Sequence, residues 1–150
     1  MKLAEALILR ADLQTRLEQI RERLTANALV QEGEKPAEDP EELLKELEDT
    51  TKHLEEMITR INLTNAATIQ NGESLTAMLA KRECLMQKIS VMRSLLSSAS
   101  HTVMRGSRME VKIFSTVPVA ELRKKTDQLS VELRTLDTAI QSANWTVELQ

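Results

Sequence analysis

The stretch KLAEALILRADLQTRLEQIRERLTANAL, residues 2–29, decides the fold. Positions spaced alternately three and four residues apart in it are mostly apolar: Leu3, Ala6, Arg10, Leu13, Leu17, Ile20, Leu24 and Asn27. This heptad spacing places one apolar stripe along a helix, which is the pattern of a coiled-coil seam. The stretch therefore predicts a long helix that packs against at least one neighbouring helix.

Three later stretches repeat this spacing, with seam positions that include Ile61 in the first of them, Leu85 and Ile89 in the next, and Leu129 and Leu133 in the last. They predict helices at about residues 40–62, 74–98 and 118–147. Between the first two helices, Gly33 and Pro36 interrupt the pattern, and Asp39 followed by Pro40 supplies an N-cap and a first-turn proline. We expect the first two helices to form an antiparallel hairpin, because the second continues the same alternation of three and four residues.

The composition excludes most sheet folds. Aromatic residues make up 1% of the chain, and there are only 3 Gly and 3 Pro, so tight turns are scarce. Hydrophobic residues make up 41%, which is enough for a core and argues against disorder. The 150 residues are therefore expected to form a single domain, 1–150, with an all-α fold: an elongated antiparallel bundle of about four long helices in two hairpins.

A short strand or β-hairpin is expected before the last helix, at about residues 102–116. Met109, Val111 and Ile113 alternate with charged residues there, and Gly106 lies in a preceding turn. The pairing partner of such a strand, within the chain or in another copy, is open.

The charge and the chain's start disfavour two classes of partner. Twenty Lys and Arg stand against 23 Asp and Glu, a net charge of −3, so no global field attracts nucleic acid. No uncharged stretch approaches the roughly 18 residues that span a bilayer, and the apolar run before Arg10 has no signal-peptide cleavage site. A single cysteine, Cys84, fits a reducing compartment. The sequence therefore predicts a cytoplasmic protein without nucleic-acid or membrane partners.

Charge is distributed unevenly along the chain. Residues 31–56 hold eleven acids and three lysines, a balance of −8, and residues 57–110 hold seven bases and three acids, a balance of +4. The second helix is therefore expected to lie against the basic part of the third, in the same chain or in a partner. A solvated acidic face is the alternative, because exposed ion pairs contribute only about 0 to 1 kcal/mol each.

Residue patterns typical of catalysis are missing from the sequence. Neither His53 nor His101 has a Glu three residues before it, as a di-metal bundle requires, and three scattered glycines cannot form a phosphate loop. We therefore expect no catalytic, cofactor-binding or metal-ligating residues, no cofactor, and no enzymatic activity.

Two arginines occupy positions where the seams call for apolar side chains. Arg10 lies in the first helix and Arg82 in the third, and a buried guanidinium needs acceptors. The candidate partners are polar residues near the seams: Glu5, Asp12, Asn62, Asn65, Glu83 and Asp127. Such a buried polar network fixes helix register or oligomeric state, or it lines a pocket for a small anion or ligand.

Two further features indicate contacts between chains. Leu7, Ile8 and Leu9 make the start of the first helix apolar on every side, so this end is expected to be enclosed by more than one helix. Trp145 either covers the end of the last helix or anchors an interface. Together with the long seams, these candidate interface anchors predict a homo-oligomer, and no other protein partner is specified.

Five separated motifs resemble a family of small bacterial helical proteins called septicolysin-like. They are MKLAEALILRADLQ at residues 1–14, QEGEKPAEDP at 31–40, INLTN at 61–65, LAKRE at 79–83 and IQSANW at 140–145. The resemblance implies a helical, oligomeric, cytoplasmic protein without an established role, and the family's name suggests a membrane-active cytolysin.

The functional expectation is a non-enzymatic, oligomeric helical protein that acts in interaction or scaffolding, in a process that the sequence does not name. A small-ligand or anion-binding protein, or an unusual enzyme, that uses Arg10 and Arg82 is one alternative. A septicolysin-like cytolysin is the other.

Overall fold

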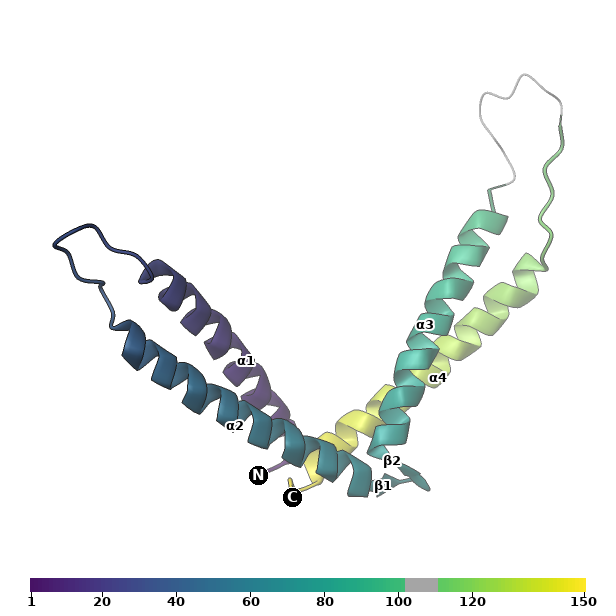
Figure 1. The fold of residues 1–150 in the computed structure, drawn as a ribbon. Helices are drawn as coiled ribbons and strands as arrows, with labels where there is room; N and C mark the ends of the chain where they lie inside the picture. The colour runs from purple at the N-terminus through teal and green to yellow at the C-terminus, as the bar shows by residue number, and fades with distance from the viewer. Residues whose placement is uncertain (102–110) are drawn as a thin grey trace. The chain divides into compact units, whose positions relative to one another are not determined.

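The computed structural model describes residues 1–101 and 111–150. The described residues form four helices and one two-stranded hairpin, in the order shown in Figure 1. Their bounds are α1 Leu3–Ala26, α2 Pro40–Ala67, β1 Ile69–Gln70, β2 Glu73–Ser74, α3 Leu75–Ala99 and α4 Val119–Thr146. The prediction of a predominantly α-helical fold is confirmed.

The chain divides into two compact units. Unit 1 comprises residues 1–74 together with 142–150, and unit 2 comprises residues 75–141. Unit 1 contains α1, α2, the β-hairpin and the end of α4, whereas unit 2 contains α3 and most of α4. The single-domain prediction stays a prediction, and each unit is described separately.

In unit 1, α1 and α2 run antiparallel along a shared apolar seam (Figure 1). Buried side chains lie at the predicted heptad positions, including Leu13 and Ile20 of α1 and Ile61 of α2. At α2's start, the Asp39 carboxylate accepts a hydrogen bond from the Glu41 amide at 2.9 Å, as the predicted N-cap requires. The first two predicted helices therefore form a hairpin.

Ion pairs flank this seam. Arg16 contacts Glu46 at 3.0 Å, and Arg23 contacts Glu38 at 2.6 Å and Glu46 at 3.2 Å. Hydrogen bonds from Arg23 and Arg16 hold the pKa values of Glu38 and Glu46, respectively, below the usual range. Part of the acidic charge of α2 and the preceding loop is therefore neutralised by α1.

The two chain ends meet inside unit 1. The Leu3 amide donates to the Val147 carbonyl at 2.9 Å, and the Leu149 amide donates to the Met1 carbonyl at 2.9 Å. Lys2 Nζ lies 2.7 Å from the Glu148 carboxylate, which holds the pKa of Glu148 low. These contacts attach the end of α4 to the start of α1.

The sequence reasoning misplaced the connection after α2. The helix does not end at residue 62 but continues to Ala67, and the fully buried Thr64 donates its hydroxyl to the Arg60 carbonyl at 2.8 Å. A two-residue turn of Asn71 (φ 51°) and Gly72 (φ 85°) then joins β1 to β2. Both residues have positive φ, as a type I′ hairpin turn requires.

The predicted strand at 102–116 is not where the described strands lie. Residues 102–110 lie outside the described residues, and residues 111–116 have no strand. Apolar and charged residues alternate in this segment, but the described part of the chain offers it no strand to pair with.

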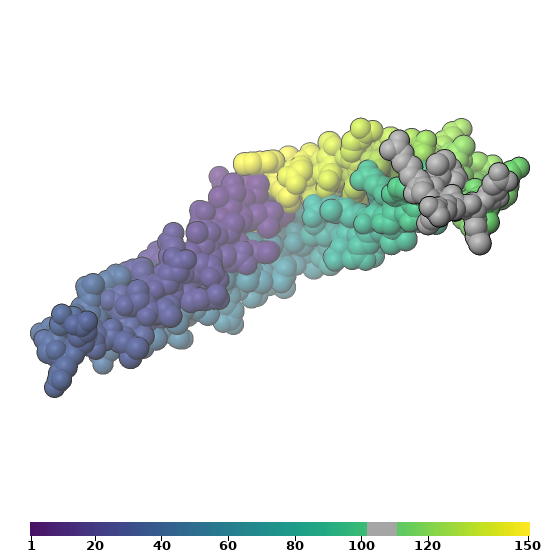
Figure 2. All heavy atoms as spheres, turned by 90° about the horizontal axis from the view of Figure 1, so that it is seen from above, coloured from purple at the N-terminus to yellow at the C-terminus, as the bar shows by residue number. Residues whose placement is uncertain are grey.

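In unit 2, α3 and α4 lie side by side (Figures 1 and 2). Leu85, Ile89 and Leu96 of α3 are buried, whereas Leu129 and Leu133 of the α4 seam are half-buried. The two helix backbones approach each other less closely than those of α1 and α2. Unit 2 therefore encloses its apolar seam less completely than unit 1.

Candidate functional site: a groove between α3 and α4

A groove of about 900 Å³ follows the two helices of unit 2. We call it the α3–α4 groove. Its lining consists of Met86, Ile89, Ser90, Arg93, Ser94 and Ser97 of α3 and Asp127, Ser130, Val131, Leu133 and Arg134 of α4.

The groove exists because small side chains occupy one face of α3. Ser90, Ser94 and Ser97 follow at spacings of four and three, so they lie on one side of the helix. On α4, the Ser130 hydroxyl turns back to its own helix and donates to the Thr126 carbonyl at 3.0 Å. Such short side chains cannot fill the space between two separated helices, so the seam beside them stays accessible.

Apolar side chains form part of the floor and part of the rim of the groove. Ile89 is 4% exposed and forms part of the core, whereas Met86 and Val131 are each 52% exposed. A half-exposed apolar side chain on each helix leaves surface that a further helix can cover.

Three charged residues line the groove without an ion pair. In the described residues, Arg93, Asp127 and Arg134 make no salt bridge. Elsewhere in unit 2, Arg82 contacts Asp137 at 3.2 Å and Lys81 contacts Glu132 at 4.0 Å. The groove therefore presents two guanidinium groups and one carboxylate to whatever occupies it.

The structure gives Arg82 a partner that the sequence reasoning did not name. The predicted partners were Glu83, Asp127 and four residues of unit 1, but the guanidinium binds Asp137. That pairing depends on how α3 and α4 are aligned side by side. The spacing of residues along one helix does not predict this alignment. Arg82 Nε is buried and has no hydrogen-bond partner in the described residues.

The remaining members of the predicted polar network lie at different places. The Glu5 carboxylate accepts from the Lys2 amide at 2.7 Å, so it serves the start of α1. Arg10 is half-buried in α1 and makes no salt bridge in the described residues. Asp12, Asn62 and Glu83 are exposed, and Asn65 is half-buried. Asp127 lines the α3–α4 groove and is exposed. The interpretation of Arg10 and Arg82 as an anion site stays a prediction.

The candidate interface anchors are more exposed than a core would allow. Ile8 is 55% exposed and Trp145 is 58% exposed, while Leu7 and Leu9 are half-buried. Trp145 is therefore not a core residue, and its role as a cover for the end of α4 stays a prediction. Its role as an interface anchor stays a prediction.

Sequence reasoning missed most of the groove residues. Met86, Ser90 and Val131 lie beside the α3 and α4 seams, so a search restricted to seam positions passes over them. A signal was present in α3, where Ser90, Ser94 and Ser97 lie on one face next to the seam.

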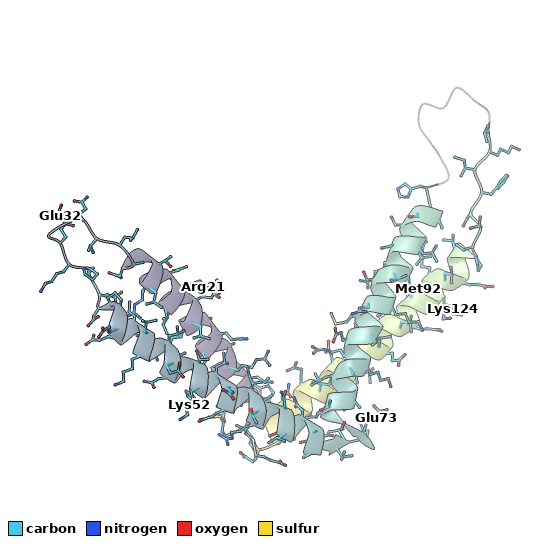
Figure 3. All side chains as sticks on the ribbon, in the orientation of Figure 1. Arg21, Glu32, Lys52, Glu73, Met92 and Lys124 are labelled. Atoms are coloured by element: carbon cyan, nitrogen blue, oxygen red, sulfur yellow. The ribbon has the colours of Figure 1, made fainter. Side chains whose placement is uncertain are left out.

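Other kinds of site find no support in the described residues. No group of three or more His, Cys, Asp or Glu side chains there is arranged to hold a metal ion. Within residues 1–101 and 111–150, no helix has the length and apolar character to span a bilayer. Figure 3 shows side chains projecting from the helices of both units, with Lys52 labelled on α2 and Lys124 on α4.

Comparisons with known proteins place the chain. The model of a family of unknown function, DUF6847, matches residues 10–149. A functionally unknown conserved protein from Corynebacterium diphtheriae, known from a crystal structure, is 40% identical in sequence to this chain. The two structures match with a TM-score of 0.91, over 100% of this chain and 99% of that chain. No curated protein matches.

These findings overturn the septicolysin-like resemblance. The family model covers residues 10–149, and neither it nor the similar crystal structure points to a septicolysin-like protein. The chain belongs to the family of unknown function DUF6847.

Proposed function

We propose that this protein is a non-enzymatic interaction protein that assembles with further copies of itself through the α3–α4 groove. The observation that carries the proposal is the open seam of unit 2, where two helices leave a groove of about 900 Å³ lined by apolar and unpaired charged side chains. Two helices alone cannot surround an apolar seam, and bundles close it with a third or fourth helix.

A second copy is the favoured occupant because the chain carries complementary charge. Unit 1 holds 17 Asp and Glu against 9 Lys and Arg, a net charge of −8. Unit 2 holds 6 against 11, a net charge of +5. Unlike units of two copies therefore attract each other, while like units repel, and the attraction weakens with salt. The predicted cytoplasmic location stays a prediction and is not required for this proposal.

The proposal is tested by placing charge on the rim of the groove. Met86→Glu combined with Val131→Glu changes two side chains that are each 52% exposed, so the fold of unit 2 is expected to survive. Light scattering coupled to size exclusion should report an oligomer for the parent protein and a monomer for this variant.

Val91→Glu is the matched control. Val91 is on α3 and is 69% exposed, but it does not line the groove. This variant should keep the oligomeric mass. The proposal is wrong if the parent protein is monomeric at 100 µM. It is also wrong if the Met86→Glu, Val131→Glu variant assembles as the parent does while circular dichroism shows that its helicity is unchanged.

A further inference from the structure

We infer that the occupant of the α3–α4 groove is helix α2 of a second copy, which enters with one exposed face. That face, the α2 stripe, consists of Leu44, Glu48, Thr51, Glu55 and Ile58. The inference rests on the proposed function and adds the identity of the element that fills the groove.

The α2 stripe lies on a face of α2 that α1 does not cover. Its residues follow at spacings of four, three, four and three, so they line one side of the helix. At 100° per residue, this side is turned by about 100° from the buried side that holds Leu43 and Ile61. Leu44 is 54% exposed, and Ile58 is half-buried. The stripe thus offers an apolar residue at each end.

Two unpaired carboxylates lie between those apolar ends. Glu46 of α2 is bound by Arg16 and Arg23 of α1, but Glu48 and Glu55 are exposed and make no salt bridge in the described residues. The acids of the α2 stripe therefore lack the internal partners that Glu46 has. They are available to cations of another molecule.

The charges of these carboxylates complement the guanidinium groups of the groove. Glu48 and Glu55 are seven residues apart, a rise of about 10.5 Å along the helix, and both lie on the α2 stripe. Arg93 and Arg134 line the groove from its two helices, α3 and α4, and neither makes a salt bridge in the described residues. The α2 stripe therefore offers one carboxylate for each unpaired arginine.

Both surfaces carry small side chains. Thr51 is the small residue between the two acids of the α2 stripe, and Ser90 and Ser130 belong to the groove lining. Small side chains on both sides allow two helices to approach closely. At one end, Met86 is available to contact Leu44 or Ile58, depending on the direction of the incoming helix.

One groove residue opposes the acidic stripe. Asp127 lowers the charge of the groove lining from +2 to +1, so the two arginines still outweigh it. The surface that receives α2 remains cationic.

A charge exchange tests the inference. Glu48→Arg with Glu55→Arg reverses the α2 stripe, and Arg93→Glu with Arg134→Glu reverses the groove. Each double variant alone should assemble at least tenfold more weakly than the parent in 50 mM salt, which corresponds to about 1.4 kcal/mol. An equimolar mixture of the two should recover assembly, because each supplies the complement of the other's changed surface.

The control moves the same charges to another face. Glu42→Arg with Asp49→Arg places two arginines seven residues apart on α2, turned by about 150° from the α2 stripe. This control should assemble as the parent does. If both charge-reversed variants assemble normally, or if their mixture fails to recover assembly, the inference is wrong.

The outcomes separate the two proposals. If Met86→Glu with Val131→Glu abolishes assembly while both charge reversals leave it intact, the groove is an interface but α2 does not fill it. If the parent is monomeric, both proposals fail together.

Discussion

Ile61 provides the most direct test of the α1–α2 core. Its side chain is 2% exposed in the seam of unit 1, at the position that the heptad spacing predicted. Ile61→Ala removes three buried carbons, worth about 2.4 kcal/mol at ~0.8 kcal/mol each, and leaves a cavity that adds to the loss. We expect the free energy of unfolding to fall by about 2 to 5 kcal/mol.

The matched control is on the same helix. Leu63→Ala removes the same number of carbons, but Leu63 is 59% exposed, so its side chain is largely in contact with water in the folded protein. This change should alter stability by less than about 0.5 kcal/mol. Urea denaturation followed by circular dichroism at 222 nm measures both variants. If Ile61→Ala and Leu63→Ala destabilise the protein by the same small amount, unit 1 does not have the core described above.

The other predictions concern the chain ends and the β-hairpin. Lys2 holds the pKa of Glu148 below its ordinary value near 4.5, so this carboxylate stabilises the fold above that pH and the contribution disappears as the pH falls through the folded-state pKa. The stability difference between the parent and Glu148→Gln should therefore be present at pH 7 and vanish in acid, and a difference that persists at pH 2 would contradict the sign. Gly72 has φ 85° with no atom within 4 Å of an added Cβ, so Gly72→Ala should cost only the backbone strain of about 1 kcal/mol. Gly72→Val should cost more in the same urea assay, since β-branched residues tolerate positive φ least.

Heptad spacing predicted the helices well for a physical reason. Leu13, Ile20 and Ile61 recur at the helical period because one side of each helix must leave water, and that requirement is visible in a single sequence. The end of α2 was harder. Thr64 resembles a helix breaker in sequence, but its hydroxyl donates to the carbonyl of the preceding turn, which is compatible with a helix.

Two other features were missed for different reasons. The Asn71–Gly72 pair is a strong local signal for a hairpin turn, but the two-residue strands on either side of it are too short to show an alternating pattern. The pairing of Arg82 with Asp137 could not be predicted from the sequence, because it depends on the register between two helices. The α3–α4 groove likewise arises from helix separation, which spacing along one helix does not specify.

Assembly is the central claim, and the mass of the parent protein in solution tests it most directly. Light scattering at 100 µM protein and 50 mM salt should give at least twice the chain mass of 16.9 kDa, and the value should fall as salt is raised. A mass of 16.9 kDa under these conditions would contradict the account.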